Sequence, residues 1–294
     1  MSETCTVGVD GSAGSRHALA WAIDRAPDHD ATLRAVWAWS VPYGESLLLG
    51  TGPSANAWQA VSDAVAADLN QVIDEVRGSR DVAIEPVTPA GPPASVLLGL
   101  SEGADLLVVG TRGRGGFTRL LLGSVSHQCA THAVVPTAVV PEGAPLGAVR
   151  SVVVGVDGSP ASQTALRWAL RFGPADADLR VIGAWQPSYT GWGAGIETYV
   201  PDLPDDSEIE FNRAVDEVED ATDRDGAPMQ RQFELGPPAS VLLAAAAEAE
   251  MLIVGVRGHG AVGAALLGSV SNAVLHRSPC TTVVVPAPDE LETD

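Results

Sequence analysis

The 294-residue sequence contains no lysine, and all 17 of its basic residues are arginine. This absence excludes a Walker-A loop, a protein kinase and a pyridoxal enzyme, because each of them depends on a lysine amine. Basic residues are outnumbered by 37 acidic residues, which gives a formal net charge of −20. Nucleic acids and anionic membranes are bound through cationic side chains, so we expect neither as a partner.

Cysteine is also scarce, with three residues in the chain. Cys5, Cys129 and Cys280 lie far apart without CxxC spacing, which argues against a disulfide framework and a zinc site. The N-terminus lacks the basic and apolar regions of a signal peptide. The longest apolar run, 239–256, is interrupted by Glu248 and Glu250 and does not indicate a membrane span. We therefore expect a cytoplasmic protein.

The chain repeats itself at an interval of 145 to 147 residues. The motif VGVDGS at 7–12 returns at 154–159, GPPASVLL at 91–98 returns unchanged at 236–243, and LGSVS at 122–126 returns at 267–271. A period this long indicates a duplicated domain. We expect one domain at 1–143 and a second at 148–288, joined by a linker at 141–147 and followed by an acidic tail at 289–294.

In each copy apolar strands alternate with helical patterns. Strands are predicted at 6–9, 33–39, 82–87, 105–109 and 137–140, and in the second copy at 152–156, 179–185, 229–235, 251–254 and 281–285. Such alternation predicts an α/β fold whose parallel sheet has helices on both faces. Ligands of these sheets bind beyond the carboxyl ends of the strands, where the strand order reverses. In the first copy, this rule predicts that a ligand binds at the loops that contain Asp10, follow Trp39 and begin at Gly110.

One glycine-spaced loop follows the fourth strand of each copy, at 110–124 in the first and at 255–269 in the second. Both contain a glycine, two residues, a glycine, nine residues and then Gly-Ser. Glycine lets the backbone approach a ligand, successive amides form an anion nest, and the helix beginning at Gly-Ser favours phosphate. Arg112, Arg114 and Arg257 supply positive charge, whereas His259 replaces Arg114 in the second copy. The alternative is a pair of glycine-rich surface loops without a ligand.

These loops, with Asp10 and Asp157 at the ends of the first strands, resemble the universal stress protein family, specifically its tandem two-domain members. The resemblance covers both halves of the chain. It implies two tandem doubly wound, Rossmann-like domains, each with a five-stranded parallel sheet, and binding of ATP with Mg²⁺. It also implies a role in stress or growth arrest and a dimer through the fifth strands, formed between chains or between the two halves.

Carried over by position, the resemblance assigns a ligand-binding role to residues in both copies. Asp10 and Asp157 would lie at the adenosine, although either could instead cap the following helix. The backbone at 38–39 and 184–185 would flank the adenine, and Gly110 and Gly255 would contact the ribose. The expected set is Gly8, Asp10, Ala38, Trp39, Gly110, Arg112, Gly113, Arg114, Gly115, Gly116, Gly123, Ser124, Val125, Ser126, Gly155, Asp157, Ala184, Trp185, Gly255, Arg257, Gly258, His259, Gly260, Gly268, Ser269, Val270 and Ser271.

No catalytic residue is predicted. Cys129 and His132 could share a metal on one helix face, but the second copy has Val274 and Arg277 there, which favours a structural role. The one Gly-x-Ser-x-Gly sequence, at 99–103, ends a predicted helix and does not join a strand to a helix as a nucleophile elbow does, and no Ser/His/Asp set recurs in both copies.

We therefore expect a cytoplasmic, ATP-binding regulator with an unidentified protein partner. The alternatives are a nucleotide-independent interaction scaffold and a slow ATPase or phosphotransfer enzyme. The loops at 40–54 and 186–207, which differ most between the copies, could be lids, partner surfaces or unselected surface loops.

Overall fold

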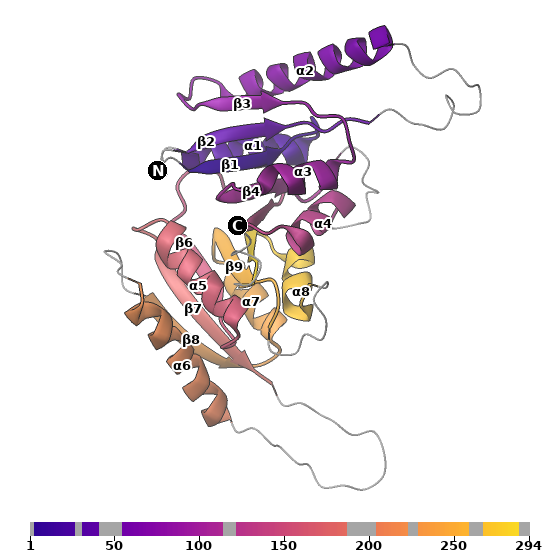
Figure 1. The fold of residues 1–294 in the computed structure, drawn as a ribbon. Helices are drawn as coiled ribbons and strands as arrows, with labels where there is room; N and C mark the ends of the chain where they lie inside the picture. Colours follow the sequence, from indigo (N-terminus) through magenta and orange to yellow (C-terminus); the bar gives the residue numbers. More distant parts are fainter. Residues whose placement is uncertain are drawn as a thin grey trace, which may run out of the picture. The chain divides into compact units, whose positions relative to one another are not determined.

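The computed structural model describes residues 3–26, 31–40, 55–113, 122–186, 204–222, 229–258 and 267–287 (Figure 1). It divides into two compact units, Met1–Ala148 and Val149–Asp294.

Unit 1 alternates strands and helices. Its elements are β1 (Thr4–Gly8), α1 (Ala13–Arg25), β2 (Thr32–Val36), α2 (Ala55–Arg77), β3 (Ile84–Val87), α3 (Pro93–Ser101), β4 (Leu106–Gly110), α4 (Ser124–His132) and β5 (Thr137–Val140). Unit 2 repeats this order with β6 (Ser151–Gly155), α5 (Pro160–Phe172), β7 (Asp178–Trp185), α6 (Pro204–Asp220), β8 (Met229–Leu235), α7 (Pro238–Ala246), β9 (Met251–Gly255), α8 (Ser269–Arg277) and β10 (Thr281–Val285).

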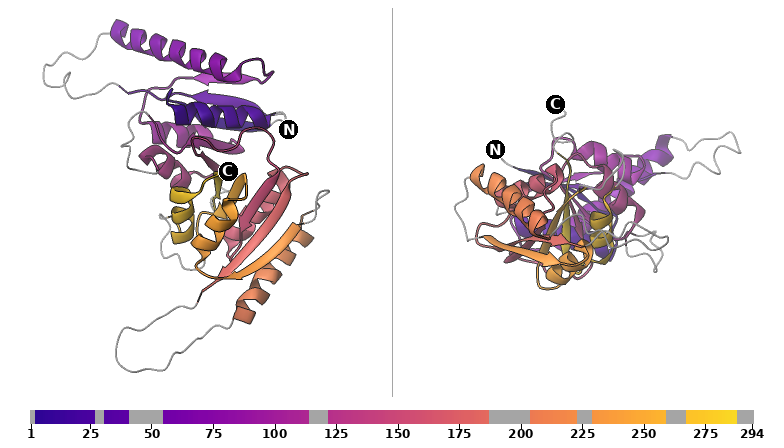
Figure 2. Two further views of the ribbon diagram at one scale, coloured as in Figure 1. Left: turned by 180° about the vertical axis from the view of Figure 1, so that it is seen from behind. Right: turned by 90° about the horizontal axis from the view of Figure 1, so that it is seen from below.

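Every described strand pair within a unit is parallel. The order is β3-β2-β1-β4-β5 in unit 1 and β8-β7-β6-β9-β10 in unit 2. Helices lie on both faces of each sheet, with α1 beside α2 and α3 beside α4, and likewise α5 beside α6 and α7 beside α8 (Figures 1 and 2). The α/β, five-stranded, doubly wound architecture is thus confirmed. The strand order reverses between β1 and β4, and between β6 and β9.

The predicted end of one strand differs from the observed one by three residues beside this reversal. Strand β2 ends at Val36 and not at Trp39, because Trp39 pairs with Ala90 only through an isolated bridge. Helix α4 begins at Ser124, as the Gly-Ser sequence predicts, and Gly123 has the extended dihedral angles of an N-cap. The early end of β2 lengthens its loop at the carboxyl edge of the sheet.

The two cores are filled differently next to this edge. Trp37 is 7% exposed in unit 1, and the same repeat position in unit 2 is Gly183. A Cβ on Gly183 would lie 2.6 Å from a ring carbon of Phe211 and 2.7 Å from one of Phe233. The two phenylalanines, whose ring centroids are 5.7 Å apart, therefore occupy the space that a single indole fills in unit 1.

The segment expected as the linker is bound to helix α1. The His17 ring nitrogen Nε2 lies 2.8 Å from the carbonyl oxygen of Ala144, and the Asp24 carboxylate accepts the N–H of Gly147 at 2.8 Å. Asp24 also pairs with Arg80 at 3.1 Å. Residues 141–148 accordingly belong to unit 1 rather than lying apart from it.

Two buried hydroxyls at the start of β10 lack a hydrogen-bond partner in the described part of the chain, those of Thr281 and Thr282. We expect Thr282→Val to stabilise unit 2 by about 1 kcal/mol, because it removes the desolvation cost of an unpaired hydroxyl. Thr137 is the matched control at the same repeat position, since its hydroxyl donates to the Val135 carbonyl at 3.3 Å. Urea denaturation should show a higher midpoint for Thr282→Val and no gain for Thr137→Val. Equal gains in both variants would contradict this account.

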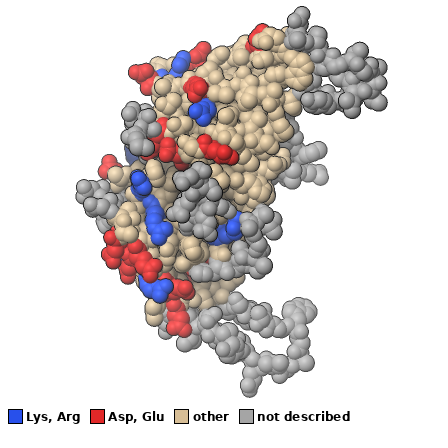
Figure 3. All heavy atoms as spheres, viewed as in Figure 1, with Lys and Arg blue, Asp and Glu red and all other residues tan. Residues whose placement is uncertain are grey.

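Acidic side chains gather over α6 (Figure 3). This helix has eight aspartate or glutamate residues in its sequence and a single arginine, Arg213. None of the described helices combines the length and the apolar character needed to cross a bilayer.

Candidate functional site

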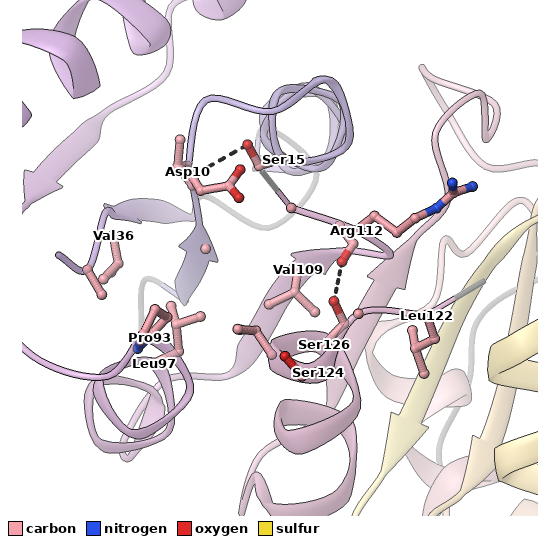
Figure 4. Close-up of a pocket in the computed structure, with 17 residues that line it drawn as sticks. Asp10, Ser15, Val36, Pro93, Leu97, Val109, Arg112, Leu122, Ser124 and Ser126 are labelled. Carbon is pink, nitrogen blue, oxygen red and sulfur yellow. Dashed lines mark hydrogen bonds between the residues drawn. The ribbon is translucent and has the colours of Figure 1, made fainter. Parts of the chain in front are cut away.

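A pocket of about 510 Å³ lies in unit 1 where the strand order reverses. It is formed by the ends of β1, β2 and β4 and by the first turns of α1, α3 and α4 (Figure 4). Its lining residues are Gly8, Val9, Asp10, Ser15, Val36, Ala38, Pro93, Leu97, Val109, Gly110, Arg112, Gly113, Leu122, Gly123, Ser124, Val125 and Ser126.

The two ends of the pocket differ in character. Val36, Pro93 and Leu97 lie together at one end, and Ser124 and Ser126 lie at the other, at the start of α4 (Figure 4). The pocket therefore suits a ligand with one flat, apolar part and one polar part.

Asp10 is held by the turn that follows β1. Its Oδ1 accepts the Ser12 N–H at 3.0 Å, and its own N–H donates to the Ser15 hydroxyl at 3.2 Å. The N-cap of α1 is Ser12, whose hydroxyl accepts the Ser15 N–H, so the alternative in which Asp10 caps the helix is wrong. The turn fixes the Asp10 carboxylate against the glycine loop.

Gly113 lies directly beneath that carboxylate. A Cβ on Gly113 would lie 2.3 Å from Oδ2 of Asp10, and a Cβ on Gly258 would lie 2.1 Å from Oδ2 of Asp157. Real Cβ atoms do not approach so closely, so a side chain on the second glycine of either loop would displace the aspartate carboxylate of the same unit.

The first turn of α4 offers main-chain donors to the pocket. Its N-cap, Gly123, provides no side-chain cap, unlike Ser12 in α1. The first amides of a helix have no intrahelical acceptor, and three pocket residues, Ser124, Val125 and Ser126, occupy these positions. Amides without an intrahelical acceptor and the positive end of the helix dipole make this end of the pocket suitable for an anion.

Ser124 and Ser126 in this turn have different structural roles. The buried Ser126 hydroxyl donates to the Gly110 carbonyl at 2.5 Å, and Ser271 donates to the Gly255 carbonyl at 2.6 Å. These hydroxyl protons tie the end of the strand to the helix. Ser124 is exposed.

We expect Ser126→Ala to destabilise unit 1 by about 1–2 kcal/mol, because it leaves a buried carbonyl without its donor. Ser124→Ala is the control and should change stability by less than about 0.5 kcal/mol, as exposed substitutions usually do. Urea denaturation measures both. Equal effects of the two variants would argue against the separate roles.

The main-chain N–H and C=O of Trp39 are hydrogen-bonded to the segment that follows β3, whereas those of Ala38 are not. The Trp39 N–H donates to Pro89, and its carbonyl accepts the Gly91 N–H. Neighbouring residues of a strand alternate in direction, so the N–H and C=O of Ala38 point toward β1. Strand β1 has ended at this level, so these groups face the pocket, whose lining includes Ala38 but not Trp39.

Unit 2 has the same residues at the corresponding positions. All but one of the 17 lining residues are identical in the second copy, and the exception is Val36, which corresponds to Ile182. Asp157 repeats the turn, since its Oδ1 accepts the Ser159 N–H at 3.0 Å. The first turn of α8 repeats that of α4, since its N-cap, Gly268, makes no side-chain hydrogen bond.

The structure brings most of the expected residues of unit 1 together at the pocket. Arg114, Gly115, Gly116, His259 and Gly260 lie outside the described residues, as does most of the two divergent loops. The sequence prediction missed seven lining residues, which are Val9, Ser15, Val36, Pro93, Leu97, Val109 and Leu122. The signal for Pro93 and Leu97 was the octapeptide at 91–98 that recurs unchanged at 236–243.

Cysteine chemistry is not available at this site. All three cysteines are buried, and burial raises the pKa of Cys5 and of Cys129 to about 12 and raises that of Cys280 as well. A thiol with such a pKa is a poor nucleophile at neutral pH. Among the described residues, no three His, Cys, Asp or Glu side chains gather as a metal site.

Comparison with known proteins agrees with this architecture. The universal stress protein family matches twice, at residues 1–141 and 148–286. Universal stress protein Rv2005c of Mycobacterium tuberculosis is 30% identical over 312 residues, with 95% of each chain covered. A universal stress protein of Mycolicibacterium smegmatis is 31% identical over 300 residues, again with 95% of each covered. The crystal structure of a universal stress protein from Archaeoglobus fulgidus shares the fold, with a TM-score of 0.68, 21% identity and coverage of 97% of this chain and 99% of that one. The chain therefore belongs to the universal stress protein family, with one family domain in each half.

Proposed function

We propose that each unit binds one molecule of ATP and that the protein is a nucleotide-dependent regulator in a stress or growth-arrest response. The observation that carries the proposal is the pocket at the strand reversal, which is apolar at one end and lined at the other by the first turn of α4, whose N-cap makes no side-chain hydrogen bond.

The apolar end fits an adenine base. Val36 and Leu97 provide apolar surface for a planar ring, and the main chain of Ala38 can offer one N–H and one C=O. Adenine offers an acceptor, N1, beside a donor, its amino group, so such a main-chain pair can bind its edge. Asp10 lies between the two ends, where its carboxylate can accept hydrogen bonds from ribose hydroxyls (Figure 4).

The other end fits phosphate. The first-turn amides of α4 and the Ser124 hydroxyl are donors, and the guanidinium of Arg112 extends outward at the rim (Figure 4). This arrangement needs no lysine, in agreement with the composition. Mg²⁺ commonly binds through phosphate oxygens and water with few protein ligands, so it would accompany the nucleotide without a protein cage.

Isothermal titration of nucleotide-free protein with ATP and Mg²⁺ tests the proposal. We expect two molecules of ATP per chain, because nearly all lining residues recur in unit 2. Mass spectrometry of small molecules released from freshly purified protein provides an independent test. Absence of heat together with absence of retained nucleotide would refute the proposal.

The same preparation separates the alternatives. A scaffold that ignores nucleotide would bind its partner equally with and without ATP. Sustained hydrolysis above roughly 1 per second would instead identify an enzyme, since this is within the usual range of kcat. The expected cytoplasmic location and the dimer through the fifth strands belong to the proposal and rest on the family resemblance. Sedimentation with and without ATP tests the dimer.

A further inference from the structure

The residues that line the pocket of unit 1 recur in unit 2 at every position except one, and the exception lies at the apolar end. Val36 follows Ala35 at the end of β2, and its counterpart Ile182 lies in β7. Both residues are 1% exposed. The two side chains differ by a single methylene group.

The main-chain carbonyl at this position is hydrogen-bonded in the same way in both units. The Val9 N–H donates to the Val36 carbonyl at 2.8 Å, and the Val156 N–H donates to the Ile182 carbonyl at 2.9 Å. The two backbones are thus anchored alike.

The floor of the pocket also matches. A Cβ on Gly8 would lie 3.0 Å from Cδ1 of Leu97 and 3.3 Å from Cγ1 of Val109. The corresponding distances from Gly155 are 2.8 Å to Leu242 and 3.5 Å to Val254. Gly8 and Gly155, which pair with Val36 and Ile182, therefore have the same close neighbours in the two units.

The next residue along the strand differs more in size between the units, but its side-chain position lies on the face of the sheet opposite to the pocket. Trp37 in unit 1 is Gly183 in unit 2, and the missing indole is replaced by Phe211 and Phe233 on the α6 side. Successive side chains of a strand point to opposite faces of the sheet.

We infer that Val36 and Ile182 make the two nucleotide sites differ in base selectivity, with unit 1 accepting a substituted purine that unit 2 rejects. The inference rests on the proposed function. One methylene in an apolar pocket is typically worth a factor of about ten or more in discrimination. A tandem chain with such sites binds unmodified nucleotide at both and a base-modified nucleotide chiefly at unit 1.

Titration with ATP, 2-chloro-ATP, 8-bromo-ATP and N6-methyl-ATP tests the inference, because these analogues enlarge different edges of the base. Wild-type protein should bind ATP at two sites and at least one analogue with two affinities about tenfold apart. Ile182→Val should convert the weak site for that analogue into a tight one. Val36→Ile should weaken the tight site by a similar factor.

Two controls accompany these variants. ADP differs from ATP only at the phosphate end, so neither substitution should change the ratio of their affinities. Thermal denaturation and circular dichroism establish that each variant remains folded. The inference is overturned if no analogue separates the two sites, or if the separation survives both substitutions. Failure of wild-type protein to bind ATP at all is a different result, which would refute the proposed function and this inference with it.

Discussion

A chain carrying both Gly113→Val and Gly258→Val should lose nucleotide binding by more than about 100-fold, or about 2.7 kcal/mol per site, and keep its helix content. The added Cβ atoms would lie 2.3 Å and 2.1 Å from carboxylate oxygens of Asp10 and Asp157. Each carboxylate must move, and the valine methyls then occupy space at the pocket. Isothermal titration measures binding, and circular dichroism measures helix content.

The fold should survive because each clash involves the end of a side chain. The carboxylate of Asp10 can rotate at the cost of its bond from the Ser12 N–H. The single variants are the internal control. Gly113→Val should leave one ATP site per chain in unit 2, and Gly258→Val should leave one in unit 1. If the double variant still binds two ATP molecules with native affinity, the loops do not form the site.

Much of the fold could be predicted from sequence because its strands are continuous apolar runs. The run in β4, Leu106–Gly110, is followed at once by glycine-spaced residues, and this placement located the pocket. The strand order could not be read in the same way. Strand β1 pairs with β4 across about a hundred residues, and that pairing follows from the packing of helices on both faces.

The site was predicted less completely, for reasons of geometry. Ser126 and Ser124 are indistinguishable as hydroxyl donors in a sequence, yet the structure turns the first toward the Gly110 carbonyl. Leu97 has helical spacing typical of a core residue, and nothing in the spacing tells which apolar side chains border a pocket. Such assignments depend on contacts between segments that are remote along the chain.

Substitution of the first glycine of each loop should reduce the stability of the fold, whereas substitution of the second should reduce nucleotide binding. We expect Gly110→Ala to destabilise unit 1 by about 3 kcal/mol, whether or not nucleotide is present. Its Cβ would lie 2.7 Å from the carbonyl carbon and oxygen of Gly14 and 3.1 Å from the Ser15 nitrogen. These are backbone atoms at the start of α1, so relief requires the helix to move away from β4. Urea denaturation measures the loss.

Gly255 and Gly99 provide the matched comparisons. A Cβ on Gly255 would lie 2.7 Å from the backbone of Ala161, so Gly255→Ala should destabilise unit 2 to a similar extent. Gly99 is exposed in α3 with no atom within 4 Å of its Cβ position, and Gly99→Ala should stabilise unit 1 by up to about 1 kcal/mol. A Gly110→Ala variant as stable as wild type would show that the close approach of α1 to β4 is not required. Together with the variants of Gly113, the result would separate the glycine that the fold needs from the glycine that the ligand needs.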